Sequence, residues 1–193
     1  SVFFSRKEVD IAILKLFCLV RGISPVKEAI LESMNIAKKH GVPVSLDLNL
    51  RLELWGWENG IRETTEKAIA LSDYIFGNAD EEILPISNKN SLDEALLSLS
   101  YGGKTIVARQ GSSGSIATVN GETIKTKAYP SEALDTLGAG DAFCGGFITS
   151  KMNGDSTEDA LKWGNAVASL QINKPGARGV PSLDEVKNVL EME

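Results

Sequence analysis

The sequence predicts an α/β domain built on a mostly parallel sheet. Short β-rich runs alternate with helical stretches along the 193 residues, and this alternation is typical of repeated strand–helix units. Turn-forming residues separate the elements, and no repeat, low-complexity tract or linker interrupts them. We therefore expect one domain over residues 1–193, a length that can bury an extensive core.

Three expected strands fall in the first half of the chain, each followed by helical sequence. Ser24 and Pro25 predict a helix start, because serine caps helices and proline fits their first turn. The cationic segment 38–40 and Gly41 predict the end of that helix, because cations complement the helix dipole and glycine suits the C-cap. We expect strands over residues 11–20, 42–46 and 73–76, and helices over 24–40, 60–71, 79–84 and 91–99.

A hairpin and three helices are expected in the second half. Asn120 and Gly121 form a turn dipeptide that commonly joins two antiparallel strands. Pro175 and Gly176 separate the last two helical stretches. We expect strands over residues 104–108, 115–119 and 123–127, and helices over 140–152, 156–171 and 182–193.

Composition excludes several classes of protein. Twenty Lys and Arg against twenty-six Asp and Glu leave a formal charge of −6, which argues against a protein that coats nucleic acid or an anionic membrane. The apolar run 11–20 contains Lys15 and is too short to span a bilayer. Cys18 and Cys144 are too few for a secreted disulfide framework and favour a cytoplasmic setting. His40 is the one histidine, so the chemistry must use carboxylates, cations and backbone amides.

Polar residues gather where the expected strands end. Ligands of open α/β sheets bind beyond the carboxyl ends of the strands. Each cluster by itself also fits ordinary loop polarity, but their shared placement favours an anionic ligand together with a metal. The clusters comprise Asp47, Asn49 and Arg51, then Asn78 with Glu81, and then Arg109 with the glycine loop from Gly111 to Gly114.

The segment 135–143 predicts an anion-binding helix start. The small residues 138–140 allow a tight turn and present backbone amides, which the helix dipole helps to make a site for negative charge. Asp141 falls in the first helical turn, where a carboxylate can accept a proton from an alcohol while the amides hold a transferring phosphoryl group. The spacing fits equally well an aspartate that only stabilises the helix N-terminus.

The segment 135–141 resembles the carboxyl-terminal signature of the ribokinase-like, or PfkB, family of carbohydrate kinases. The resemblance covers nearly everything from about Gly22 to the end. It implies a ribokinase-like three-layer α/β/α fold with a mostly parallel central sheet. The other matching segments follow in the family's order: 47–55 resembles Asp-x-Asn-x-Arg with a trailing Leu-Trp, 78–81 matches Asn-x-x-Glu, 111–114 matches the glycine loop, and Asn165-Ala166 with Gly176-Ala177 resembles the adenine-side region.

The resemblance implies roles for the residues around the helix start. Asp141 would be the base that activates the sugar hydroxyl, and the amides of Gly138, Ala139 and Gly140 would form the anion hole. Asp135, with the carbonyl of Leu137, would belong to a monovalent-cation site for K⁺.

The same resemblance implies roles for the strand-end clusters. Glu81 would hold Mg²⁺ through water, and Asn78 would lie near the phosphates of ATP. The remaining residues divide into two groups, with Arg51, Asp47 and Asn49 contacting phosphate or substrate, and Arg109, Gly111, Gly114 and Asn165 contacting the nucleotide.

The implied activity is ATP-dependent phosphorylation of a sugar or sugar-acid hydroxyl. The pattern from Arg51 to Trp55 is typical of fructokinases and of 2-keto-3-deoxygluconate kinases in the family. It narrows the expected substrate to ketoses or keto sugar acids and does not choose between them.

The family's amino-terminal substrate-binding region, glycine-rich signature and β lid have no visible counterpart in this sequence. We therefore expect the carboxyl-terminal nucleotide-binding and catalytic portion of a larger kinase, poorly active or inactive alone. An uncovered sheet edge predicts self-association, as a homo-oligomer, or packing against a separate segment. The alternative is a truncated, noncatalytic nucleotide-binding remnant with a structural or regulatory role.

Overall fold

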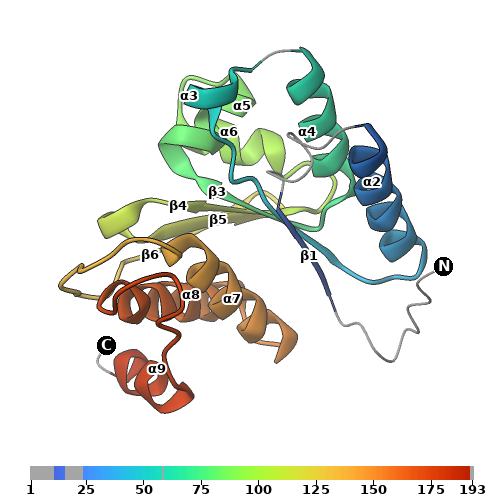
Figure 1. Ribbon diagram of the computed structural model, residues 1–193. Helices are drawn as coiled ribbons and strands as arrows, with labels where there is room; N and C mark the ends of the chain where they lie inside the picture. The colour runs from blue at the N-terminus through green and yellow to red at the C-terminus, as the bar shows by residue number, and fades with distance from the viewer. Residues whose placement is uncertain (1–10, 16–23, 58, 192–193) are drawn as a thin grey trace. The chain divides into compact units, whose positions relative to one another are not determined.

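The computed structural model describes residues 11–15, 24–57 and 59–191, and Figure 1 shows the course of the chain. Within these residues the strands form one sheet in the order β1-β2-β3-β4-β5-β6. The pairs β1–β2 and β2–β3 are parallel. The strands are β1 Ala12–Lys15, β2 Val44–Asp47, β3 Tyr74–Asn78, β4 Thr105–Arg109, β5 Ser115–Val119 and β6 Glu122–Thr126.

By its internal contacts the chain divides into two compact units. The first comprises Ser1–Ala108 with Thr118–Glu122, and the second comprises Arg109–Ala117 with Thr123–Glu193. The expectation of a single domain over residues 1–193 stays a prediction.

The core of the first unit lies around its parallel strands. Leu46 of β2 lies opposite Ile75 of β3, and both are fully buried. Ile106 and Val107 of β4 are buried as well, as expected for strands covered on both faces. The helices α2 and α4 lie side by side in this unit (Figure 1). Its helices are α2 Ser24–Lys39, α3 Leu52–Trp55, α4 Asn59–Leu71, the π-helix η1 Ala79–Ile83, α5 Leu84–Ser87 and α6 Leu92–Leu99.

The end of α2 confirms the predicted C-cap. Lys38 and Lys39 occupy the last turn, and Gly41 has a φ of 68°, in the left-handed region that glycine adopts without strain. The N–H of Val42 donates to the carbonyl of Ala37 at 2.9 Å, which is the long bond of a Schellman cap. His40 therefore belongs to a helix end, as predicted.

Two closely packed helices dominate the second unit. The aromatic rings of Phe143 and Phe147 of α7 lie 6.4 Å apart in its core, and both are buried. The α7–α8 contact is the most extensive between any two described elements. The elements of this unit besides strands are the 3₁₀ turn η2 Gly111–Ser113, α7 Ala139–Met152, α8 Thr157–Ile172 and α9 Leu183–Leu190.

The predicted elements are confirmed with local differences. The segment expected as one helix over 79–84 is a π-helix followed by α5, and α3 was not predicted. The expected strand over 11–20 is present as β1, and residues 16–20 lie outside the described residues. Asn120 and Gly121 both have positive φ, as a tight hairpin turn requires. No helix in the described part of the chain is long and apolar enough to cross a membrane.

Candidate active site

The end of β2, at the buried Asp47, and the segment after it carry the first group of predicted residues. Leu48 and Leu50 are buried, whereas Arg51 between this segment and α3 is exposed. The N–H of Leu48 donates to the carbonyl of Phe76 at 2.9 Å, so β2 and β3 stay paired beyond Asp47. Asn49 has a φ of 39°, a left-handed conformation that asparagine tolerates. Buried leucines thus anchor a short segment on which Asp47, Asn49 and Arg51 alternate with them.

Asn78 ends β3 and caps the π-helix η1. Its side-chain oxygen accepts the N–H groups of Asp80 and Glu81, each at 3.0 Å. Glu81 is exposed in the first turn, directly beyond the carboxyl end of β3. The predicted pair Asn78 and Glu81 is therefore brought together, with the asparagine side chain fixing the turn that presents the glutamate.

Glu82 is a buried carboxylate that the sequence reasoning missed. It is only 4% exposed, and its two oxygens accept the N–H of Leu50 and the N–H of Asn78. The second of these bonds is 2.6 Å long. The local sequence carries no signal of this burial, because the neighbouring acidic residues Asp80 and Glu81 are both exposed.

The predicted anion hole lies at the start of α7. Gly138 is the N-cap with a φ of 84°, and a Cβ there would lie 3.0 Å from the Cβ of Ala177. The first amides of a helix have no acceptor within it, so Gly140 and Asp141 contribute such groups to this turn. The amide of Ala139 donates to the carbonyl of Thr136 at 3.2 Å. Its place in the anion hole stays a prediction.

Asp135 braces the turn that leads into α7. One carboxylate oxygen accepts the N–H of Leu137 and the other accepts the N–H of Gly176, both at 2.9 Å. These two backbone donors lower the pKa of Asp135 because they stabilise its charged form. On the other side of Gly176, the buried side chain of Gln171 donates to the carbonyl of this residue at 2.8 Å. The predicted K⁺ role of Asp135 stays a prediction.

Arg109 lies against the first turn of α7. Its Nη1 donates to the carbonyl oxygen of Gly140 at 3.3 Å and to the sulfur of Cys144 at 3.2 Å. A Cβ at position 140 would lie 3.1 Å from the same nitrogen. A glycine here therefore lets the guanidinium approach the helix backbone closely. Arg109, Gly138, Gly140 and Asp141 are thus gathered in the second unit.

The glycine loop has two glycines with different surroundings. Gly111 has a φ of 57° and open space around the position of a Cβ. Gly114 has a φ of 99°, and a Cβ there would lie 2.1 Å from the carbonyl oxygen of Thr126. The carbonyl of Gly114 accepts the N–H of Gln110 at 2.8 Å and closes the loop. Close packing of the chain is enough to require glycine at position 114.

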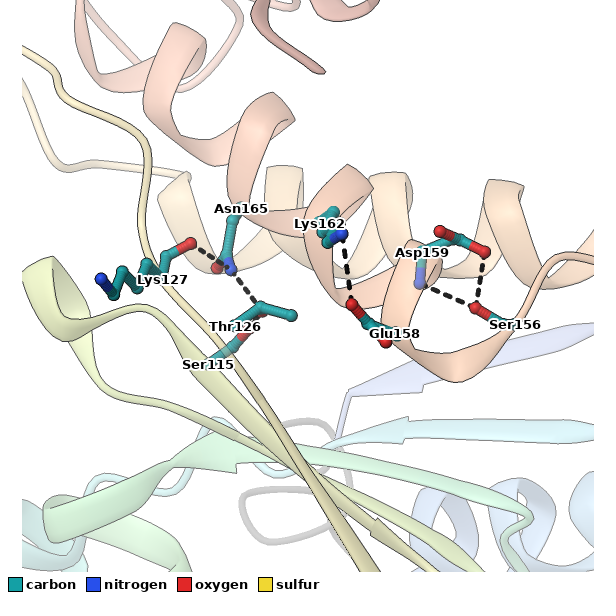
Figure 2. A network of polar contacts seen from close by, with 8 residues as sticks. All are labelled: Ser115, Thr126, Lys127, Ser156, Glu158, Asp159, Lys162 and Asn165. Atoms are coloured by element: carbon teal, nitrogen blue, oxygen red, sulfur yellow. Dashed lines mark hydrogen bonds and ion pairs between the residues drawn. The ribbon is translucent and has the colours of Figure 1, made fainter. Parts of the chain in front are cut away.

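Asn165 joins α8 to the end of β6, as Figure 2 shows. Its side-chain nitrogen donates to Thr126 Oγ1 at 2.9 Å and to the carbonyl of Lys127 at 3.0 Å. The hydroxyls of Thr126 and Ser115 lie 3.2 Å apart in the same network. Asn165 is 6% exposed. Its hydrogen bonds in the structure therefore hold α8 against the end of β6. Its contact with a nucleotide stays a prediction.

A cavity of about 420 Å³ lies beside the start of α7. Gly138 and Asp141 border it, and α8 contributes Trp163 and Val167 to its walls. Residues around α9, including Val186, complete the lining. Apart from Asp141 and a few other polar groups the walls are apolar, so the carboxylate lies at the edge of a largely apolar hollow.

The oxygen donors beyond the end of β3 suit a Mg²⁺ ion. In the part of the chain that the structure describes, no group of three or more His, Cys, Asp or Glu residues could hold a metal ion. Exposed Glu81 is a single oxygen donor next to Asn78. Mg²⁺ suits such a place because it keeps several waters and binds through one or two carboxylates plus phosphates.

Comparison with known proteins identifies the family. The family model "pfkB family carbohydrate kinase" matches residues 13–183. A curated relative, 5-dehydro-2-deoxygluconokinase of Listeria monocytogenes serotype 4b, is 33% identical over 178 residues, which cover 86% of this chain and 53% of the relative. The chain belongs to the PfkB family of carbohydrate kinases. It spans about half the length of the curated relatives it matches.

Solved structures show the same fold. One is a double mutant of fructokinase from Vibrio cholerae, bound to fructose, ADP and potassium. Its TM-score is 0.84 at 22% sequence identity, and the match covers 97% of this chain and 64% of the fructokinase. Another is a candidate ribokinase II from E. coli in complex with ATP and Mg²⁺. Its TM-score is 0.86 at 22% sequence identity, and the match covers 97% of this chain and 60% of the ribokinase. The predicted ribokinase-like α/β fold, a sheet flanked by helices, is confirmed.

Proposed function

We propose that this chain is the nucleotide-binding and catalytic portion of an ATP-dependent kinase that phosphorylates a hydroxyl group of a keto sugar or keto sugar acid. The observation that carries the proposal is the start of α7. Asp141 is exposed in its first turn, directly after the glycine turn at Gly138, and the guanidinium of Arg109 contacts the carbonyl of Gly140. This places a carboxylate, helix-start amides and a cation in one short stretch of structure.

These groups supply what phosphoryl transfer needs. The oxygen of the substrate hydroxyl bonds to the γ-phosphorus of ATP, and the bond from that phosphorus to the leaving ADP oxygen breaks. Asp141 accepts the proton that the hydroxyl loses in this step. Negative charge on the transferring group is stabilised by the first-turn amides and the positive end of the helix dipole. Arg109 adds a positive charge beside the same turn.

We assign the two proposed metal ions, Mg²⁺ and K⁺, to one carboxylate each. Glu81 would hold Mg²⁺ through water, and Mg²⁺ when bound neutralises charge on the phosphates of ATP. Asp135 would take part in a K⁺ site at the turn before α7. The ATP-and-Mg²⁺ and the ADP-and-potassium complexes of the two structural neighbours support these assignments.

We further propose a keto sugar acid as the substrate. The curated relative acts, by its name, on 5-dehydro-2-deoxygluconate. Arg51 is exposed on the segment after β2, where a guanidinium can bind a substrate carboxylate in a bidentate manner. Asp47 at the end of β2 and Asn49 on the segment after it would contact substrate hydroxyls.

The base assignment is tested by Asp141→Asn in the protein encoded by the complete gene. Loss of a general base lowers turnover by about 100-fold or more, and we expect nucleotide binding to persist. Asp184→Asn is the matched control, because Asp184 is also an exposed aspartate in the first turn of a helix. ADP release measures turnover, and near-normal turnover in Asp141→Asn would refute the assignment.

The substrate is tested with 5-dehydro-2-deoxygluconate, 2-keto-3-deoxygluconate, fructose and ribose. We expect the highest kcat/KM for one of the two keto acids. Arg51→Ala should raise the KM for that acid about tenfold or more and change the KM for fructose little, because fructose has no carboxylate. Nucleotide binding without phosphate transfer to any acceptor would favour the noncatalytic alternative.

A further inference from the structure

Glu82 carries two backbone bonds that join distant parts of the first unit. Leu50 lies 32 residues before it and Asn78 lies four residues before it. A buried carboxylate is costly unless hydrogen bonds satisfy it, and Glu82 is 4% exposed. The side chain is therefore held between the two segments and does not reach solvent as Glu81 does.

The two amides that Glu82 binds belong to two segments of the candidate site. Leu50 directly precedes Arg51 on the segment after β2. Asn78 caps η1, which presents Glu81. The side chain of Glu82 thus links two parts of the candidate site. One is the segment that carries Arg51, the proposed contact to phosphate or substrate, and the other is the helix that carries Glu81, the proposed Mg²⁺ ligand.

Packing around Gly77 shows independently that these segments approach closely. A Cβ at Gly77 would lie 2.9 Å from Cδ1 of Leu48 and 3.0 Å from Cδ1 of Ile83. Leu48 belongs to the segment after β2, and Ile83 belongs to η1. The π-helix itself is a rare geometry that occurs frequently at functional sites.

We infer that Glu82 is a positioning residue that fixes the Arg51 segment and the Glu81 helix relative to each other. This inference rests on the proposed kinase function. A glutamine at this position keeps the size of the side chain but sets an NH₂ group against one of the two N–H donors. One of the two bonds is then lost, and Arg51 and Glu81 no longer keep their spacing.

The kinetic test compares Glu82→Gln with Glu63→Gln in the protein encoded by the complete gene. Glu63 is an exposed glutamate of α4 in the same unit. We expect Glu82→Gln to lower kcat/KM for Mg-ATP by about tenfold or more, as for other groups that orient metal-site residues, and to raise the Mg²⁺ concentration needed for half-maximal rate. If the unaltered protein is active and Glu82→Gln changes neither the kcat/KM for Mg-ATP nor the Mg²⁺ requirement, the inference about Glu82 is overturned. The proposed kinase function would still stand.

A double-mutant cycle with Arg51→Ala separates positioning from a general loss of stability. If Glu82 acts by placing Arg51, its substitution should cost much less once Arg51 is gone, so the two effects are not additive. Fully additive effects would overturn the inference. If Glu82→Gln does not fold, Glu82→Asp takes its place, because it keeps both acceptor oxygens and withdraws them by one methylene.

Amide hydrogen exchange in the metal-free protein tests the same link without activity. We expect slow exchange at the amides of Leu50 and Asn78, and faster exchange at one or both of them in Glu82→Gln but at neither in Glu63→Gln. Unchanged exchange at both amides would overturn the inference. If the unaltered protein transfers no phosphate, the proposed function is rejected instead. The exchange measurement would still decide whether Glu82 links the two segments.

Discussion

Gly114 and Gly111 belong to one loop but meet different physical demands. Both have positive φ, yet only Gly114 faces backbone atoms that a side chain would strike. The close approach of the loop to the segment 126–128 thus gives Gly114 a structural reason to be glycine. Room for a nucleotide against the backbone remains a proposal for Gly111, around which the space is open.

Gly114→Ala should therefore destabilise the protein much more than Gly111→Ala. We expect the free energy of unfolding to fall by about 3 kcal/mol or more in Gly114→Ala, since a clash adds to backbone strain. Gly111→Ala should cost only about 1 kcal/mol, the strain of a left-handed alanine. Urea unfolding measures both, and equal losses would contradict the contact with Thr126.

Asp135 makes one contribution to stability depend on pH. Its pKa is lowered in the folded protein, so its stabilising effect is present above the ordinary carboxyl pKa of about 4. The effect is lost as the pH falls through the lower folded value. We expect the Tm difference between unaltered protein and Asp135→Asn to shrink as the pH falls below about 4.

Thermal unfolding between pH 6 and pH 3 measures this difference. Asp184→Asn controls for the removal of one aspartate charge at an exposed site of the same unit. A Tm difference for Asp135→Asn that stays constant over the range would contradict the role of the Leu137 and Gly176 amides.

At the scale of elements, glycines set the approach of α7 to α8. A Cβ at Gly146 would lie 2.8 Å from the carbonyl oxygen of Trp163, and one at Gly164 would lie 2.8 Å from the ring of Phe143. Both helices thus use small residues where they touch. The close packing holds α7 in place, and α7 carries Asp141 in its first turn.

Gly146→Ala should weaken this helix pair, whereas Gly145→Ala should not. The extra methyl at 146 meets backbone atoms, and overpacking of this kind costs about 1–3 kcal/mol. At Gly145 the space is open, so alanine should stabilise the helix by up to about 1 kcal/mol. Denaturant unfolding of the two variants checks the prediction, and a stable Gly146→Ala protein would contradict the close contact.

At the scale of the whole molecule, each of the two compact units carries its own group of proposed functional residues. Arg51, Asn78 and Glu81 lie in the first unit, and Arg109 and Asp141 lie in the second. The chain spans about half the length of its curated relatives, so sugar phosphorylation by the whole protein is a proposal. Self-association also stays a prediction, which sedimentation velocity would measure.

Nucleotide binding by this chain is the corresponding prediction. We expect isothermal titration to detect Mg-ADP or Mg-ATP at millimolar concentration, and saturating nucleotide to raise the Tm, because a ligand that binds only the folded state stabilises it. Arg109→Ala should weaken binding, because we propose that this cation contacts the nucleotide phosphates. No heat and no Tm shift at millimolar nucleotide would contradict a functional nucleotide site in this chain.

Much of the fold and part of the site could be predicted from the sequence. The end of α2 at Gly41 and the hairpin turn at Asn120 depend on local backbone preferences, which neighbouring residues reveal. The capping of η1 by Asn78 depends on contacts four residues apart at most, so its segment was also recognised. Glu82 was missed because the amide of Leu50, 32 residues away, decides that this carboxylate is buried.

The sequence by itself determined the order of strands and helices, the family, and the short stretches that carry Asp141, Glu81 and Arg51. These properties reside in local patterns of a few consecutive residues. Only the tertiary structure decided that Arg109 contacts Gly140, that Asp135 and Gln171 both hold Gly176, and that Asn165 ties α8 to β6. Such contacts join residues that are often far apart in the chain, and they form only when the packing of buried side chains brings the segments together.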